Sequence, residues 1–350
     1  MISGDKPKSK LKGILNYTLS LLLAAVFLYL AFYDVNFGDV LKIVSNASLL
    51  WIFVFIAVLM FAHYLRAIRW KIILSSVKKD SSVKNLFGAI MIGYGVNCVV
   101  PRLGEVSRAV LVGKWENLSR SSMFGSVILE RVIDIMFLGF SVLIALIFYS
   151  NRIMTNFPWL QDTLYITFFL IGVVFLFFYL AIKYKQRFYN VVVKFLGRFS
   201  EKFAHKVAYI FQMLGDGFGS LKGTRNYVLT FVLSAIIMIL YAFNAYIGFF
   251  MLGMQNIQPV TFQMAWVFMS ISAIGVVIPT PGGTGSYHAL AKSTLVLLFG
   301  FSEVVSLAYA FLTHIVTYFL YVFSGLILFL IMNKQHDNII KVAETEIEEL

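Results

Sequence analysis

Long runs of apolar residues, separated by short polar segments, dominate the chain. Each complete run is near the ~20 residues that an α-helix needs to cross a hydrocarbon core about 30 Å thick. A β-barrel would instead show alternating segments of ~10 residues. The pattern therefore predicts an all-α polytopic membrane helix bundle of about seven spans. The predicted spans lie at about Ile14–Phe32, Leu49–Leu65, Met123–Phe148, Leu164–Ile182, Tyr227–Leu252, Phe262–Ile278 and Glu303–Met332.

Two further segments are interrupted within their apolar pattern. The first, at 83–112, breaks at Pro101 and restarts with charged residues, and the second, at 279–299, opens with two prolines and three glycines. Irregular backbone at membrane depth is tolerated only where protein buries it or where it lines a cavity. We expect the rest of the chain to hold these two broken hairpins near each other, and each hairpin is either re-entrant or makes two complete crossings. Their opposed entry suggests an inverted repeat, and transporters of that kind bind at the midplane.

The composition is that of a membrane protein. In such a protein a positive net charge indicates topology and contact with anionic headgroups, and not nucleic-acid binding. The chain is 60% hydrophobic and 13% charged, whereas soluble domains carry about 25% charged residues. The formal net charge is +12, but the basic residues lie in connections between spans. The positive-inside rule then predicts that both termini are cytoplasmic. Anionic headgroups on that face are the expected partners of these residues, and nucleic acid is not.

The segments outside the spans divide the chain further. We expect a cytoplasmic basic N-terminus at 1–13, a single transmembrane domain at 14–332 and a cytoplasmic polar tail at 333–350. Within the domain, apolar residues of 183–225 recur every three or four positions beside a basic stripe. This pattern favours a basic amphipathic helix on the membrane surface, and the alternative is a solvated cytoplasmic linker.

The first break carries the chemistry that we single out first. Glu105 and Arg108 are three positions apart, so they share a helix face and are jointly neutral. Together they predict a polar pocket that grips a lipid headgroup, with Arg102 or Arg108 toward phosphate. The alternative is a salt-bridged staple that closes the helix break. The candidate substrate-binding residues here are Asn97, Pro101, Arg102, Gly104, Glu105 and Arg108.

A second charged group opens the span at Met123–Phe148. Glu130 and Asp134 share a face, and Arg131 can reach Asp134 at a spacing of three residues. The group is either part of a substrate site or an interfacial ion cluster that sets the depth of the span. We keep both interpretations, and we include Glu130, Arg131 and Asp134 among the candidate substrate-binding residues.

The second break predicts an anion site. Prolines remove amide donors, and glycines allow positive φ and close approach of the backbone. The amides of Gly282 to Ser286 lie where a helix begins, and a helix N-terminus attracts anions. The alternative is a tight surface turn, and the run matches neither a P-loop nor a dinucleotide fingerprint. The candidates are Pro281, Gly282, Gly283, Gly285 and Ser286.

Two histidines complete the candidate site. His288 follows the second break, and His314 lies in the last span with Tyr318 one turn later. Membrane-embedded histidines can relay protons, and they are also used as hydrogen-bonded fixtures.

No arrangement for catalysis is apparent. We find no nucleophile with a base, no zinc signature and no cofactor motif, so we expect neither an enzyme nor a metal or cofactor site. Cys98 is the single cysteine. Small residues such as Ala89 and Gly93 favour close helix packing, either within one chain or in a homo-oligomer.

An ordered set of motifs in this chain resembles the lysylphosphatidylglycerol synthase transmembrane-region family. The set consists of Asn97, Pro101-x-x-Gly104-Glu105-x-x-Arg108, Glu130-Arg131-x-x-Asp134 and Pro279-x-Pro281-Gly282-Gly283-x-Gly285. The resemblance covers about residues 15–330. It implies a helical lipid translocase with re-entrant segments, like the flippase half of multiple peptide resistance factors. Synthase members carry a further soluble domain, for which this chain has no segment.

Two positions depart from the family pattern. His288 stands where a glutamate usually follows the glycine-rich break, and His314 stands where an arginine is usual in the last span. If those positions pair, both have changed together. The change weakens the case for an aminoacylated lipid and leaves lipid or amphiphile transport in place.

The sequence thus predicts a lipid flippase of the bacterial inner (cytoplasmic) membrane. Its substrate would be an anionic or aminoacylated phospholipid, or a related amphiphile. An alternative from another class is a non-transporting, lipid-binding scaffold for a separately encoded enzyme that modifies lipids or the cell envelope. An intramembrane lipid-modifying enzyme is a third, disfavoured by the missing catalytic groups.

Overall fold

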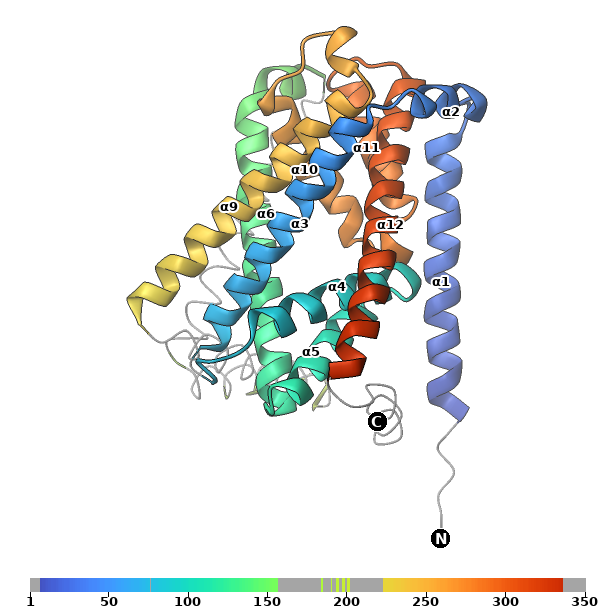
Figure 1. Cartoon of the computed structure of the whole chain (residues 1–350). Helices are drawn as coiled ribbons and strands as arrows, with labels where there is room; N and C mark the ends of the chain where they lie inside the picture. The colour runs from blue at the N-terminus through green and yellow to red at the C-terminus, as the bar shows by residue number, and fades with distance from the viewer. Residues whose placement is uncertain are drawn as a thin grey trace. The chain divides into compact units, whose positions relative to one another are not determined.

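The architecture of the chain is helical. In a computed structural model, residues 7–75, 77–156 and 223–335 are described, with a few single positions between 184 and 201. These residues form α-helices joined by turns, and no strand occurs among them (Figure 1). The predicted fold class is therefore confirmed as helical.

Four described helices are long and apolar enough to cross a membrane. They are α3 (Leu49–Leu74), α6 (Arg120–Asn156), α9 (Thr224–Met251) and α12 (Glu303–Gln335). A fifth span exists if α1 (Pro7–Phe32) and α2 (Phe37–Ser45), which are bent by 84°, count as one. The predicted spans at Leu49, Met123, Tyr227 and Glu303 match the four long helices, whereas the total of seven stays a prediction.

Helix α2 lies between the first two predicted spans, where the sequence analysis expects no helix. Asn36 caps it, because its side-chain Oδ1 accepts a hydrogen bond from the Gly38 amide at 2.9 Å. Val40 is fully buried, and it belongs to a core cluster with Ala31 of α1 and with Leu307 and Ala308 of α12. The helical spacing of Phe37, Val40, Leu41 and Val44 is the signal that identifies this helix.

Helix α3 also corrects an expected boundary. We predict that the second span ends at Leu65 and that Arg66, Arg69 and Lys71 begin a cytoplasmic connection. The helix instead continues to Leu74, and Arg66 and Arg69 are 5% and 0% exposed. Two of the cations that the positive-inside argument assigns to a loop are therefore inside the protein.

The two interrupted segments form two pairs of short helices. The first pair is α4 (Val83–Val99, 17 residues) and α5 (Leu103–Trp115, 13 residues). The second is α10 (Phe262–Val277, 16 residues) and α11 (Ser286–Leu297, 12 residues), with the short 3-10 helix η2 (Pro281–Gly283) between them. At 1.5 Å per residue, α10 is roughly 24 Å long, which is shorter than a hydrocarbon core. The predicted complete span at Phe262–Ile278 is therefore the first half of a broken pair.

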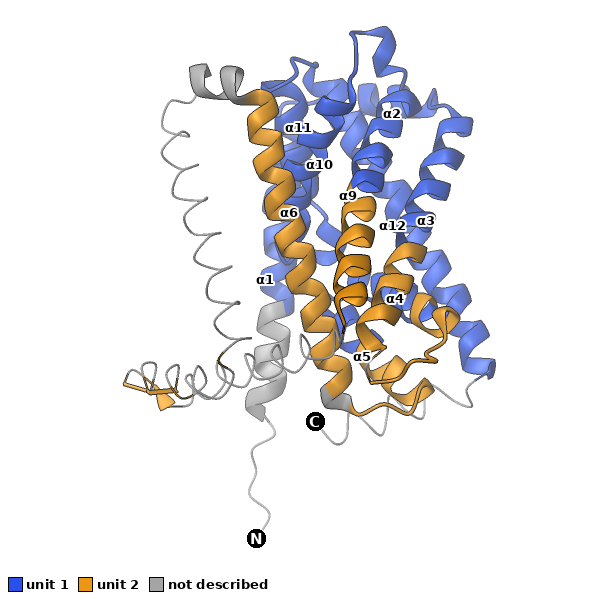
Figure 2. Cartoon of the chain, turned by 90° about the vertical axis from the view of Figure 1, so that its left-hand side faces the viewer, with its two compact units in different colours: residues 1–63, 88–108, 239–350 blue, residues 64–87, 109–238 orange. Residues whose placement is uncertain are grey.

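The chain divides into two compact units, which are coloured in Figure 2. Unit 1 comprises 1–63, 88–108 and 239–350, and unit 2 comprises 64–87 and 109–238. A core cluster of unit 1 joins Phe55 and Leu59 of α3 to Ile247 and Met251 of α9 and Leu312 of α12. In unit 2, the fully buried Trp70 donates from its indole Nε1 to Ser126 Oγ at 3.0 Å.

Several predicted segments fall outside the described residues. They are the span at Leu164–Ile182, most of the basic segment 183–225, residues 1–6 and the tail from 336. The surface helix and the domain boundaries stay predictions.

Candidate functional site

The first break is closed by a side chain from the preceding helix. Helix α4 ends at Val99, and Arg102 has a φ of 65° just before α5 begins. Asn97 Oδ1 accepts from the Gly104 amide at 2.7 Å, and Asn97 Nδ2 donates to the Glu105 carboxylate at 3.2 Å. The first amides of a helix have no partner within it, so Asn97 supplies one of the missing acceptors.

Helices α4 and α5 touch backbone to backbone. A Cβ on Gly104 would lie 2.0 Å from the carbonyl oxygen of Gly93, and a Cβ on Gly93 would lie 2.8 Å from that of Gly104. Only glycine fits at such distances. Arg108 is 3% exposed on the α5 face toward Gly93. The close packing expected of Gly93 is thus made within this chain.

Backbone amides of the second break donate hydrogen bonds to acceptors in the break itself and in the first turn of α11. Gly282, Gly283 and Gly285 all have positive φ. The Gly283 amide donates to Thr280 O at 3.0 Å, and the Thr284 amide donates to Pro281 O at 2.9 Å. The Gly285 amide donates to His288 Nδ1 at 3.3 Å. The expectation that amides from Gly282 to Ser286 are available for an anion is therefore wrong for Gly283, Thr284 and Gly285, whose amides have acceptors in the loop or in the first turn of α11.

Ser286 and Gly285 tie this loop to its neighbours. The Ser286 hydroxyl donates to Gly275 O of α10 at 2.7 Å, and the side chain is fully buried. A Cβ on Gly285 would lie 2.5 Å from Ala24 O of α1, so glycine is needed where α1 crosses the loop. Ser286 holds the start of α11 against α10, which leaves its hydroxyl hydrogen unavailable to a ligand.

The two breaks meet in unit 1, as the sequence predicts. The Tyr318 hydroxyl of α12 donates to Cys98 O, at the end of α4, at 3.1 Å. A Cβ on Gly282 would lie 3.1 Å from the Tyr318 ring and 3.5 Å from Cys98 Cα. Arg102 Nη2 also donates to Val277 O, the last residue of α10, at 3.4 Å. Tyr318 thus joins the two segments, and we call this contact the break junction.

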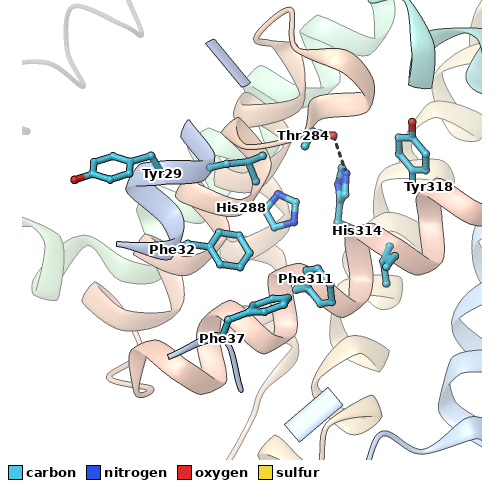
Figure 3. A pocket seen from close by; sticks show the side chains of 10 residues that line it. Tyr29, Phe32, Phe37, Thr284, His288, Phe311, His314 and Tyr318 are labelled. Carbon is cyan, nitrogen blue, oxygen red and sulfur yellow. Dashed lines mark hydrogen bonds between the residues drawn. The ribbon is translucent and has the colours of Figure 1, made fainter. Parts of the chain in front are cut away.

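His288 and His314 lie side by side next to the break junction. Their ring centroids are 4.6 Å apart, and His314 Nε2 lies 3.3 Å from Thr284 Oγ1 (Figure 3). The ring of Tyr287 stacks on His314 with centroids 5.6 Å apart. Tyr287 is itself held by a 2.8 Å hydrogen bond between its hydroxyl and Thr313 Oγ1. The pair is therefore packed from one side by an aromatic ring and bonded from another by the loop.

An apolar cavity of about 600 Å³ opens beside the two imidazoles. Helices α1 and α2, the second break and α12 supply its walls, and Figure 3 shows Phe32 on the side of His288 away from His314. No Asp, Glu, Lys or Arg occurs among the ten described residues that line it. They are Leu28, Tyr29, Phe32, Phe37, Thr284, His288, Phe311, His314, Ile315 and Tyr318.

The third predicted group, around Glu130, lies in unit 2 and is paired with the two arginines of α3. Arg66 Nη2 donates to Glu130 Oε1 at 2.7 Å and also to the Asp134 carboxylate. Arg69 Nη2 donates to Asp134 Oδ1 at 2.6 Å and to Glu130 Oε1 at 3.2 Å. Arg69 Nη1 donates to Ser234 Oγ at 2.9 Å. We call Arg66, Arg69, Glu130 and Asp134 the charge cluster.

The charge cluster is neutral overall, since two guanidinium groups face two carboxylates. Arg131 lies at its edge, with Nη1 3.8 Å from Asp134 Oδ2. Sequence reasoning finds the two acids and misses Arg66 and Arg69. The available signal is that the apolar pattern continues past them through Trp70, Ile72, Ile73 and Leu74, which places both arginines inside a helix.

The comparisons with known proteins agree with this architecture. The family described as the lysylphosphatidylglycerol synthase TM region matches residues 17–325. The chain belongs to this family. A UPF0104 membrane protein of Methanocaldococcus jannaschii is 23% identical over 334 residues, which cover 91% of this chain and 96% of that protein. A second UPF0104 membrane protein, of Methanothermobacter thermautotrophicus, is 30% identical over 90 residues, or 24% of this chain and 27% of that protein. No solved structure matches.

Membership of the lysylphosphatidylglycerol synthase TM region family and the apolar helices together establish a multi-pass membrane protein. The two candidate histidines, His288 and His314, belong to one contact and one cavity wall. Among the residues with described side chains, no group of three His, Cys, Asp or Glu is placed to hold a metal. The site therefore combines a hydrophobic cavity with a small set of uncharged polar groups.

Proposed function

We propose that this protein moves a lipid, or a related amphiphile, between the two leaflets of a prokaryotic cytoplasmic membrane. The observation that carries the proposal is the continuity of the apolar cavity with the break junction. Tyr318 belongs to both, because it lines the cavity and donates to Cys98 O. Thr284 and His288 come from the second break and also line the cavity.

This arrangement suits an amphiphile for a physical reason. Acyl chains need apolar walls, which Leu28, Phe32 and Phe311 provide. A polar headgroup in hydrocarbon needs hydrogen-bonding partners, and broken helices supply them only where the backbone lines a cavity or is buried. Transporters place their sites where two discontinuous helices meet. Family membership supports the same proposal, and the curated relatives named above are archaeal, so bacterial origin remains a sequence-based expectation.

A leaflet-accessibility assay in proteoliposomes tests this function. Fluorescent anionic, zwitterionic, uncharged and aminoacylated lipids are placed in one leaflet, and their appearance in the other is followed without nucleotide. Ile315→Trp should fill the cavity and reduce transport, since Ile315 is a wall residue. Leu326→Trp is the matched control, because it adds the same ring to an exposed position of the same helix. Equal lipid exposure in protein-containing and protein-free liposomes would contradict the proposal.

A further inference from the structure

The hydrogen bond at the start of α11 determines the tautomer of His288. The Gly285 amide donates to Nδ1, and a backbone amide can only donate, so Nδ1 carries a lone pair. In a neutral imidazole the proton then sits on Nε2, which becomes a donor. The ring lines the cavity, and in Figure 3 it lies between Phe32 and His314. The wall of the cavity therefore includes a histidine that is held by the loop through Nδ1 and is a hydrogen-bond donor through Nε2.

The remaining polar groups of the cavity are uncharged as well. Thr284 Oγ1 and His314 Nε2 share one hydrogen bond, and the Tyr318 hydroxyl gives its hydrogen to Cys98 O. The lining contains no carboxylate, ammonium or guanidinium group among the described residues. A charge placed in such surroundings would lose its hydration without gaining an oppositely charged acid, lysine or arginine among the described lining residues, which is strongly unfavourable.

Part of the cavity wall lies on the exposed surface of α1. Tyr29 lines it and is 64% exposed, and its exposed neighbours Val26 and Leu30 in α1 and Tyr33 just after the helix extend this exposed apolar surface. In a membrane this surface contacts acyl chains. The volume of about 600 Å³ lies within the range of roughly 300–1,000 Å³ that is usual for ligand pockets. It is suited to the polar region and the first part of the chains of one lipid, with the remaining chain outside.

We infer that the cavity selects a lipid whose polar group is uncharged and accepts a hydrogen bond, such as the hydroxyl and ester groups of a diacylglycerol. The His288 Nε2–H donates to that acceptor, and the apolar wall takes the adjoining chains. Phosphate and ammonium headgroups are excluded from the cavity because none of the described lining residues is an acid, a lysine or an arginine that could neutralise them. The inference rests on the proposed function and narrows it to one class of lipid.

Photolabelling of the purified full-length protein tests the inference without transport. Two probes carry the same diazirine-bearing acyl chains, one being a diacylglycerol and the other a phosphatidate, so that the two differ only in having a hydroxyl or a charged phosphate as the headgroup. We expect diacylglycerol to label peptides of α1 and α12 at least about tenfold more than phosphatidate at equal concentration, since only the phosphate must lose its hydration unpaired. Equal labelling of those peptides by both probes would overturn the inference.

Two variants of His288 separate recognition from folding. His288→Gln keeps an oxygen to accept from Gly285 N and an amide hydrogen to donate, so it should retain diacylglycerol labelling. His288→Glu keeps the acceptor for Gly285 but replaces the donor by a carboxylate. It should lose about tenfold of the diacylglycerol labelling, because a buried acceptor without a donor costs the full desolvation of the pair. Unchanged labelling in folded His288→Glu protein would overturn the inference.

The proteoliposome assay is read beside the labelling. Diacylglycerol labelling of the cavity without movement of any lipid would support the site and overturn the transport proposal. Movement of anionic lipids without diacylglycerol labelling of α1 and α12 would support transport and overturn the assignment of an uncharged substrate.

Discussion

The charge cluster of unit 2 and the cavity of unit 1 are both polar features within apolar helices, but their polar groups are used differently. In the cluster, Arg66 and Arg69 share the Glu130 and Asp134 carboxylates at distances down to 2.6 Å between Arg69 Nη2 and Asp134 Oδ1. In the cavity, the described lining residues bear no charge, and about 600 Å³ is open. The charged groups of the cluster bond to one another. The cavity is open, and we infer that the His288 Nε2–H can donate to a ligand there. The ion pairs of the cluster and the open cavity thus support different roles, and we propose that the cavity, not the cluster, holds the substrate.

Removing one member of the cluster should have the largest effect on stability. Glu130→Ala leaves two buried guanidinium groups with a single carboxylate, and breaking a buried ion pair in this way costs about 3–5 kcal/mol. The unfolding temperature in detergent should fall sharply. Arg131→Ala, which changes a more exposed neighbour 3.8 Å from Asp134, should change it much less.

Glu130→Ala also tests whether the charge cluster is separate from the functional site. If Glu130→Ala protein unfolds at the wild-type temperature but moves no lipid, the cluster belongs to the functional site and our division between the two regions is wrong.

The glycine contact of the first break should give the next largest effect. In Gly104→Ala the new Cβ would lie 2.0 Å from Gly93 O, and neither group is the end of a flexible side chain. Overpacking of this kind costs about 1–3 kcal/mol or more. In Gly113→Ala, further along α5, the new Cβ would lie 3.4 Å from Met123 Cγ and 3.5 Å from Leu118 O, which are ordinary contacts, so the change should be tolerated. Comparable unfolding temperatures for the two variants would refute the close packing of α4 and α5.

Tyr318→Phe tests whether the hydroxyl on the cavity wall is needed for transport or only for stability. It removes the hydrogen bond to Cys98 O, which contributes about 0.5–1.5 kcal/mol. We expect a small loss of stability and a larger loss of transport, because Tyr318 joins the two breaks. Tyr33→Phe, at a residue that is 61% exposed, serves as the matched control. A transport rate that falls only as much as stability would mean that the hydroxyl is structural.

The smallest expected effect is the pH dependence of stability that comes from Glu116. This residue pairs with Lys78 in unit 2, outside the spans. Burial raises the pKa of Glu116, but hydrogen bonds from Lys78, Asn85 and the Ser82 amide outweigh it and hold the pKa below the ordinary value of 4.5. The folded state thus binds this proton less readily than the unfolded state. Its contribution to stability is complete above pH 4.5 and is lost as the pH falls through the lower folded pKa.

Unfolding temperatures of the wild type and Glu116→Gln, measured across acidic pH, check this sign. The difference between the two proteins should shrink as the pH falls. A difference that grows toward low pH would contradict the assignment.

The apolar runs of the sequence predict most of the long helices. They do not predict which residues of different helices contact one another. The long helices α6, α9 and α12 are recognisable because their apolar runs exceed the membrane thickness. The break residues Pro101 and Pro281 are recognisable because proline and glycine interrupt such runs. The meeting of Tyr318 with Cys98 is only a hypothesis before the structure, since contacts between residues over 200 positions apart leave no local pattern.

The errors have the same physical origin. Arg66 and Arg69 resemble the basic end of a span because charge is normally kept out of hydrocarbon, and only tertiary pairing with Glu130 and Asp134 makes their burial possible. The amides of Gly283 and Gly285 resemble an anion site because a glycine-rich helix start usually has free donors. His288 accepts from one of them, which a sequence pattern cannot show.

The central claim is that lipid passes through the cavity, and chemical blocking of the cavity after folding tests it most directly. In a Cys98→Ala background, Ile315→Cys is reacted with a bulky maleimide in proteoliposomes, and lipid transport is compared before and after. Cys98 can be replaced because its carbonyl, not its thiol, bonds to Tyr318. The account predicts that complete modification abolishes transport, while the same reaction at Leu326→Cys leaves it unchanged. Undiminished transport after complete modification of Ile315→Cys would contradict it.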